Sequence, residues 1–206
     1  MKIIRVSPSE RRKGQFTVHF EDETEIKVSA AQIADFGIYS GRELDDDEYP
    51  ELCASLELSS SKTQSLRILG SRNLSSGEVK KRLMNTGVSA GTAGETVEWL
   101  EDIGAVNDTE YAAMIARHYF SKGYGAARIR DELYKRGIPR ELWEDALLVS
   151  EGYEDAAQEF LEKKLRGSRD KNELRRVTDT LCRRGFSYSD ACEAVRRYLE
   201  NLSAEE

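Results

Sequence analysis

Residues 123–138, GYGAARIRDELYKRGI, form a short stretch rich in arginine and lysine that ends next to a glycine. Ala126, Ile129 and Leu133 recur at the three- and four-residue spacing that places side chains on one face of a helix. Gly137 follows Leu133 by four residues, at the position where a left-handed glycine commonly ends a helix. This stretch therefore predicts a basic amphipathic helix with one buried face.

A leucine followed four residues later by glycine occurs in three similar basic segments. They are EVKKRLMNTGV, RIRDELYKRGI and RRVTDTLCRRGF, with anchor pairs Leu83/Gly87, Leu133/Gly137 and Leu181/Gly185. The anchors lie 50 and 48 residues apart, and so regular an interval indicates a structural repeat. Since three helices of about a dozen residues bury little apolar surface alone, neighbouring repeats should stack. The fold class predicted is mainly α, with three tandem three-helix repeats in an elongated, curved array.

Helices are also predicted before and after each basic helix. Each preceding helix carries two or three apolar residues. The following helices are predicted over residues 96–103, 141–149 and 188–202. Ser75 and Glu78 have the S-x-x-E spacing of a capping box, and Ser187 with Asp190 offers a cap to the last helix. The apolar residues expected to face the core from the preceding helices are Leu66, Leu69, Ile115, Tyr119, Phe120, Phe160 and Leu165.

The N-terminal segment alternates apolar and polar residues, which is typical of strands. The residues expected to face inward are Ile4, Val6, Phe16, Val18, Phe20, Ile26 and Val28. A small antiparallel β element is therefore predicted, followed by a short helix that starts near Ser29 and stops at Gly37 or Gly41. The acidic DDDEYPE at 45–51 reads as a connector. Predicted domains are residues 1–60 (N-terminal extension), 61–106, 107–151 and 152–202 (repeats one to three).

Charge is distributed unevenly along this chain of 206 residues and formal net charge -7. Residues 21–57 hold twelve acidic and two basic residues, whereas residues 162–197 hold eleven basic and six acidic ones. Such asymmetry concerns partners and association rather than fold. No apolar run approaches the length of a membrane span, and the N-terminus lacks the apolar segment of a signal peptide. We therefore expect a cytoplasmic protein without membrane contact.

The sequence offers no convergent reactive groups. Cys53, Cys182 and Cys192 form no CxxC pair, and His19 and His118 are far apart, so neither a metal site nor a disulfide framework is expected. His118 is interpreted as a partly buried packing residue. Phosphate-loop, serine-hydrolase and zinc-protease motifs are missing from the sequence. We expect no enzymatic activity and no cofactor.

Three motifs resemble those of the RecX family, regulators of the bacterial recombinase RecA. They are LGSRNLSSGEV, GAVNDTEYA and KGYGAARIRDELYKRGI, and the resemblance covers roughly residues 60–200. The N-terminal strands followed by FGIYSGREL resemble an extension found in some members. Asn73 departs from the family, since many members carry proline there, and Gly94 departs by loosening the third helix of the first repeat.

The resemblance implies a non-catalytic regulator in homologous recombination, DNA repair and the SOS response. Proteins of this family bind the RecA filament on single-stranded DNA, typically in its helical groove. They mostly inhibit, restraining ATP hydrolysis, strand exchange and co-protease activity. The expected partners are therefore the RecA filament and the single-stranded DNA within it, bound by a monomer. The alternative is a direct DNA-binding protein that uses helix-turn-helix-like basic repeats. The N-terminal strands would hold a dimer or cap the first repeat.

Basic residues of the second and third repeats are the candidate contacts. Asp131 can pair with Arg128 or Lys135 along the helix. Ion pairs on an ordinary solvent-exposed helix face would therefore account for some of these basic residues without a binding partner. In the third repeat Asp179 can pair with Arg175 or Arg183, and Glu193 can pair with Arg197. The remaining cations of that repeat have no obvious helical partner, which suits phosphate or an acidic protein surface; they are Arg166, Arg169, Lys171, Arg176 and Arg184. The candidate partner-binding residues are Arg128, Lys135, Arg166, Arg169, Lys171, Arg176 and Arg184.

Overall fold

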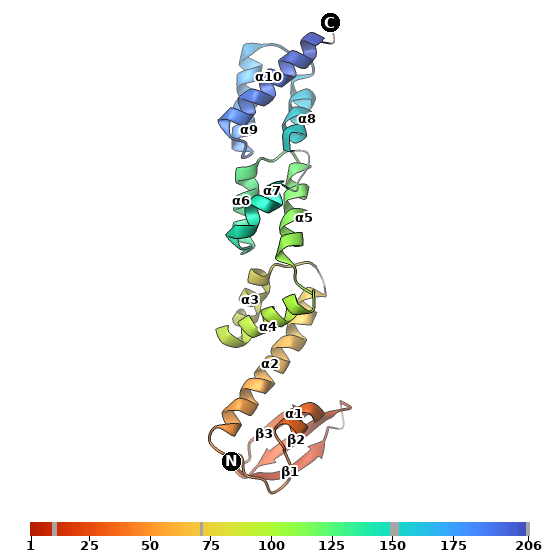
Figure 1. The fold of residues 1–206 in the computed structure, drawn as a ribbon, viewed down its shortest axis with the longest axis vertical. Helices are drawn as coiled ribbons and strands as arrows, with labels where there is room; N and C mark the ends of the chain where they lie inside the picture. The colour runs from red at the N-terminus through yellow and green to blue at the C-terminus, as the bar shows by residue number, and fades with distance from the viewer. Residues whose placement is uncertain (10–11, 71, 149–152, 205–206) are drawn as a thin grey trace. The chain divides into compact units, whose positions relative to one another are not determined.

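The computed structural model of the chain describes residues 1–9, 12–70, 72–148 and 153–204. The chain divides into two compact units, residues 1–71 with 82–99 and residues 72–81 with 100–206. Figure 1 shows a small sheet near the N-terminus followed by helices to the C-terminus, as the sequence predicted. Within the described ranges, no helix has both the length and the apolar character needed to cross a membrane.

The N-terminal sheet is antiparallel, in the order β1 (Ile3–Pro8), β2 (Gln15–Phe20) and β3 (Glu25–Ser29). Helix α1 (Ala30–Asp35) follows at once, and Ser29 caps it through a reciprocal capping box with Gln32. The end of α1 is marked by Gly37, whose φ is +56°. The buried core of this region comprises Ile3, Val18, Phe20, Val28, Ile38, Leu44 and Leu52.

One residue predicted to face the core of the sheet lies outside it. Ile4 is 56% exposed, and its neighbour Ile3 is fully buried in its place. The pairing of β1 with β2 changes register between Ile3 and Arg5. Because successive side chains of a strand point to opposite faces, an irregularity of this kind changes which residue points inward.

Helix α2 (Glu48–Leu69) begins earlier than the sequence predicted. It takes in most of the expected acidic connector and runs through the predicted boundary between residues 60 and 61. Pro50 lies in its first turn, where the missing backbone N–H has no partner to lose. The side chains of Arg42 and Glu48 form an ion pair of 2.5 Å beside the start of this helix.

Small polar residues line the buried side of α2 where it meets α4 (Ala90–Asp102) in the first repeat. Ser61 and Thr96 are fully buried, and the Thr96 hydroxyl donates a hydrogen bond of 2.8 Å to that of Ser61. Leu66, predicted to face the core, is 47% exposed. Hydroxyl pairing between short side chains replaces the expected leucine packing here.

The second repeat is built from α5 (Asp108–Phe120), α6 (Ala126–Lys135) and the 3-10 helix η1 (Arg140–Leu142), which leads into α7 (Trp143–Leu148). The third comprises α8 (Tyr153–Leu165), α9 (Lys171–Arg183) and α10 (Tyr188–Ala204). The predicted anchors Leu133 and Leu181 are fully buried in their respective cores. Residue 149, the predicted end of a helix, and the predicted boundary at 151 and 152 lie outside the described residues.

The recurring leucine and glycine form the closing turn of each middle helix. In α6 the Gly137 N–H donates to the Tyr134 carbonyl and the Ile138 N–H to the Leu133 carbonyl, at 2.9 and 3.1 Å. This is the Schellman arrangement, which requires a left-handed residue after the helix. Gly87, Gly137 and Gly185 supply it, with φ values of +94°, +66° and +95°.

Candidate partner-binding surface

The end of α9 docks onto the start of α6. The Gly125 N–H donates to the Arg184 carbonyl and the Ala127 N–H to the Gly185 carbonyl, both at 3.0 Å. Gly125 is the N-cap of α6 and has no side chain to supply the usual capping oxygen. Carbonyl groups from the next repeat therefore satisfy amides at the first turn of α6 that otherwise lack a partner.

The end of α6 also meets the start of α3 (Ser76–Asn85), but here a side chain makes the bond. The Ser75 hydroxyl donates to the Arg136 carbonyl, which is equivalent to the Arg184 carbonyl in the third repeat. Ser75 and Glu78 also form the predicted capping box, with N···O distances of 3.0 and 3.2 Å. The end of one middle helix is therefore hydrogen-bonded to the start of the middle helix before it at both junctions, through backbone groups between α9 and α6 and through the Ser75 side chain between α6 and α3.

Asp108 adds a buried carboxylate to this second junction. It is 8% exposed and accepts hydrogen bonds from the Ser76 N–H at 2.9 Å and the Ser76 hydroxyl at 2.5 Å. We expect Asp108→Ala to lower the free energy of unfolding by about 1–2 kcal/mol, because it removes a cap from the first turn of α3. Urea denaturation checks this, with Asp131→Ala on the exposed surface of α6 as the control, expected to change stability by less than about 0.5 kcal/mol.

Four exposed cations occupy equivalent positions in the second and third repeats. Arg128 and Arg176 lie five residues before the anchor leucine, and Lys135 and Arg183 lie two residues after it. Seven residues are close to two helical turns, so each pair shares one face of its helix. We call these four residues the basic ridge. In the first repeat the same positions hold Glu78 and Asn85, so the ridge belongs to the second and third repeats.

Only part of the charge on the ridge is paired. Lys135 reaches Glu132 at 3.9 Å, and Arg183 bonds to the Asp179 carbonyl and the Thr180 hydroxyl of its own helix at 3.4 and 3.3 Å. Within the described part of the chain, neither Arg128 nor Arg176 makes an ion pair. The expected pairing of Asp131 with Arg128 or Lys135 is likewise not found among these residues.

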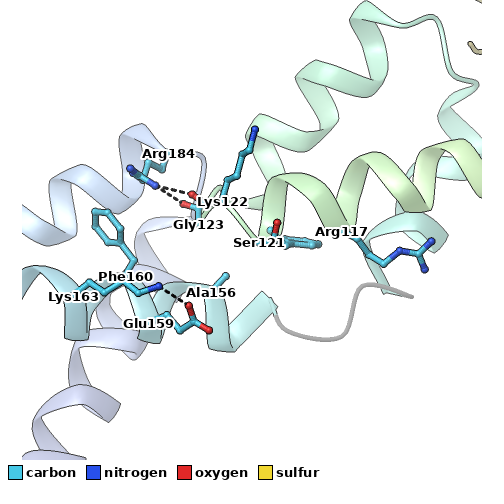
Figure 2. Close-up of a pocket in the computed structure, with 10 residues that line it drawn as sticks. Arg117, Ser121, Lys122, Gly123, Ala156, Glu159, Phe160, Lys163 and Arg184 are labelled. Atoms are coloured by element: carbon cyan, nitrogen blue, oxygen red, sulfur yellow. Dashed lines mark hydrogen bonds and ion pairs between the residues drawn. The ribbon is translucent and has the colours of Figure 1, made fainter. Parts of the chain in front are cut away.

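Arg184 is not the unpartnered surface cation that the sequence predicted. It is half-buried, and its Nη1 donates to the carbonyls of Lys122 and Gly123 at 3.0 and 3.2 Å, as Figure 2 shows. Its guanidinium carbon lies 4.3 Å from the ring centroid of Phe160 and 5.3 Å from that of Tyr124. These contacts tie the third repeat to the second, so Arg184 has a structural role.

Arg136 occupies the equivalent position in the second repeat and is also turned inward. Its Nη1 donates to the Tyr111 hydroxyl at 2.6 Å, and its guanidinium carbon lies 5.7 Å from the centroid of that ring. Burial raises the pKa of the Tyr111 hydroxyl, an effect that the charge of Arg136 partly offsets. The arginine before each closing glycine therefore packs on an aromatic ring in both repeats, whereas the residue before it faces solvent.

The three candidates in and beside the loop between α8 and α9 are exposed. Arg169 Nη2 donates to the Leu202 carbonyl of α10 at 3.0 Å, so it has a partner that sequence spacing did not reveal. Arg166 has a left-handed backbone, with φ +49°, and Lys171 begins α9. The structure therefore separates these three from the basic ridge, which omits Arg184 and gains Arg183.

Metal-binding residue types are not clustered in the described part of the chain. This part holds no group of three histidine, cysteine or acidic side chains able to bind a metal ion. His118 is exposed rather than partly buried, with its ring against that of Tyr119 at a centroid distance of 5.6 Å. Cys53 and Cys182 are half-buried thiols and Cys192 is an exposed one.

Comparison with known families identifies two of the repeats. The model described as "RecX, second three-helix domain" matches residues 107–147, and "RecX, third three-helix domain" matches residues 151–195. Among curated proteins, Regulatory protein RecX of Xanthomonas axonopodis pv. citri is 31% identical over 141 residues, which cover 67% of this chain and 87% of the relative. The namesake from Bacillus subtilis is 27% identical over 205 residues, covering 96% and 77%.

Solved structures show the same fold. A crystal structure titled regulatory protein RecX has a TM-score of 0.75 at 20% identity and covers 95% of this chain and 98% of its own. The crystal structure of RecX from Lactobacillus salivarius has a TM-score of 0.64 at 23% identity and covers 70% and 97%. At these identities the likeness concerns the arrangement of helices and strands.

Proposed function

This chain belongs to the RecX family of regulatory proteins, and from that membership and the basic ridge we propose that it regulates the recombinase RecA without being an enzyme. It binds the RecA filament on single-stranded DNA as a cytoplasmic monomer. There it restrains ATP hydrolysis, strand exchange and co-protease activity.

The observation that supports this proposal is the repetition of the basic ridge on consecutive, linked repeats. A filament presents the same surface again and again along its axis. Two similar cationic faces held in one unit can therefore engage two such surfaces, or two stretches of its DNA backbone. Weak contacts that are linked in this way gain affinity through effective concentration.

The direct test measures RecA activity with the purified full chain. We expect it to suppress RecA ATP hydrolysis on single-stranded DNA at substoichiometric amounts and to co-sediment with the filaments. Unchanged ATP hydrolysis together with no co-sedimentation would reject the proposal.

Charge reversal of the basic ridge tests which surface carries the binding. The variant R128E/K135E/R176E/R183E should bind filaments about tenfold more weakly, because it replaces attraction by repulsion at four exposed positions. The matched control R12E/K13E/K27E/R67E alters the net charge by the same amount, at four positions outside the second and third repeats. Co-sedimentation at several salt concentrations measures both, and equal binding by the two variants would contradict the assignment.

Direct binding to naked DNA is the second candidate, favoured by the absence of ion pairs for Arg128 and Arg176 in the described residues. It predicts measurable affinity for oligonucleotides without RecA, with a steep dependence on salt because phosphate contacts release counterions. Fluorescence anisotropy measures this affinity. Tight binding to filaments without affinity for naked DNA would reject this second function.

A further inference from the structure

A cavity of about 620 Å³ opens to solvent where the second and third repeats meet. Figure 2 shows its lining, which comes from the end of α5 and the following turn, from α8, and from Arg184. It belongs neither to the basic ridge nor to the loop between α8 and α9. Its volume lies within the range of about 300–1,000 Å³ typical of ligand pockets in proteins.

Two phenylalanines and two small residues give the lining of this cavity an apolar part. Phe120 and Phe160 are buried, and Ala156 and Gly123 leave space beside them because their side chains are small or missing. The Arg184 guanidinium covers the Phe160 ring and is held there by its two carbonyl partners. A bulky apolar group that entered here would be removed from water against aromatic carbon.

The rim is cationic. Arg117 and Lys122 are exposed, and neither makes an ion pair within the described residues. Lys163 pairs with Glu159 at 2.9 Å, and among the described residues of the lining that glutamate is the one carboxylate. The described lining of the cavity therefore combines a small apolar part with excess positive charge.

The backbone makes this cavity unsuitable for a compact phosphate. The N–H groups of Ser121, Lys122 and Gly123 already donate to carbonyls at the end of α5, at 3.0, 3.1 and 2.8 Å. The turn also follows the C-terminus of α5, whose partial negative charge disfavours any anion held against the backbone there. A negatively charged ligand must therefore be held by the exposed side chains of Arg117 and Lys122 at the rim. A site for phosphate normally offers free backbone N–H groups and the opposite end of a helix.

We propose that this cavity binds a short acidic peptide segment of a protein partner. One bulky aliphatic side chain of that segment lies against Phe120 and Phe160, and flanking carboxylates pair with Arg117 and Lys122. The apolar side chain supplies most of the affinity, because exposed ion pairs contribute little each. The charged rim selects acidic segments, since a basic one would meet three exposed cations. This inference does not depend on the proposed action on RecA.

Fluorescence anisotropy with the full chain tests this site. The probe is a labelled seven-residue peptide of aspartate and glutamate with one central leucine. Replacing that leucine by alanine should weaken binding about five- to tenfold, since it removes the group that fills the cavity. Inorganic phosphate and a short oligothymidylate are the competitors. Each is added at low concentration with the ionic strength held constant, and neither should displace the peptide.

Two variants of the chain locate the binding. R117E/K122E reverses two exposed rim charges and should weaken peptide binding at least fivefold, while Ala156→Trp should fill the cavity and abolish it. The matched control K80E/K81E makes the same charge change on exposed residues of α3, outside the cavity and the basic ridge, and should bind as the parent does. Circular dichroism checks folding, and R117E/K122E decides the outcome if Ala156→Trp fails to fold.

Several results would overturn the proposal. The first is equal binding of the leucine and alanine peptides, and the second is undiminished peptide binding by R117E/K122E. The third is that oligothymidylate displaces the peptide from the parent chain and that R117E/K122E no longer binds oligothymidylate. The last of these would assign the cavity to nucleic acid. Failure here leaves suppression of RecA ATP hydrolysis by the parent chain untouched, so the two proposals fail separately.

Discussion

Gly125→Ala is expected to lower the free energy of unfolding of the second and third repeats by about 3 kcal/mol. The new Cβ would overlap the carbonyl carbon and oxygen of Gly185 and the amide nitrogen of Phe186. These are backbone atoms, so no side-chain rotation can relieve the overlap. Overpacking in a tight site costs about 1–3 kcal/mol, and a contact between two backbones should reach the upper end.

The geometry of Gly125 makes this substitution a clean steric test. Its φ is -88°, which alanine adopts without strain. Alanine also restricts the unfolded chain, which by itself would stabilise the protein by a few tenths of a kcal/mol or more. Any loss of stability must therefore come from the contact with the end of α9.

Hydrogen exchange at Ala127 measures the docking directly, because its N–H donates to the Gly185 carbonyl. We expect faster exchange there in the variant and an earlier transition in urea. Gly91→Ala is the matched control, since a Cβ at Gly91 in α4 would lie 4.0 Å from the Ser89 hydroxyl, its nearest neighbour outside the backbone of its own helix. A Gly125→Ala variant as stable as Gly91→Ala would show that the two repeats are not held by this junction.

Local spacing was sufficient to predict where each middle helix ends. Leucine followed by glycine four residues later is a property of one turn, so Gly87, Gly137 and Gly185 could be assigned their left-handed backbones from sequence. The role of Gly125 could not be predicted in this way. Its backbone is ordinary, and the atoms that exclude a side chain come from a segment 60 residues away.

Hydrophobicity alone was a poorer guide to which face of an element is buried. Ser61 and Ser65 are buried in α2 while Leu66 is exposed, because a short hydroxyl side chain lets the neighbouring helix approach and bonds to it. In β1 a register change brings Ile3 rather than Ile4 into the core. Both errors depend on how a second element packs against the first. The periodicity of residues within one element carries no information about that packing.

The assignment of the candidate surface failed at one position for a related reason. Arg183 and Arg184 are adjacent and chemically identical, and helical spacing alone favoured Arg184, because it gave Arg183 a partner in Asp179 and Arg184 none. The turn that precedes Gly185 directs Arg184 toward Phe160 and leaves Arg183 in solvent. Aligning the repeats on the anchor leucine does separate the two arginines, because it places Arg183 at the position of Lys135 and Arg184 at the position of Arg136.

Arg184→Met should therefore destabilise the protein without directly altering the surface that we propose binds the filament. Methionine keeps an unbranched stem on Phe160 but loses the charged hydrogen bonds to the Lys122 and Gly123 carbonyls and the contact with the ring. Hydrogen bonds from a charged group contribute about 1.5–3 kcal/mol and a cation over a ring about 0.5–2 kcal/mol. Allowing for overlap between them, we expect a loss of about 2–3 kcal/mol.

The neighbouring substitution Arg183→Met separates stability from recognition. Arg183 is exposed and bonds only within its own helix among the described residues, so its loss should change the free energy of unfolding by less than about 0.5 kcal/mol. Filament binding should show the reverse order, with Arg183→Met weaker by about two- to fivefold and folded Arg184→Met within twofold of the parent. Urea denaturation and co-sedimentation below the unfolding transition measure the two effects. If Arg184→Met were fully stable and Arg183→Met bound normally, Arg184 rather than Arg183 would belong to the binding surface, and the inward position assigned to this arginine would be wrong.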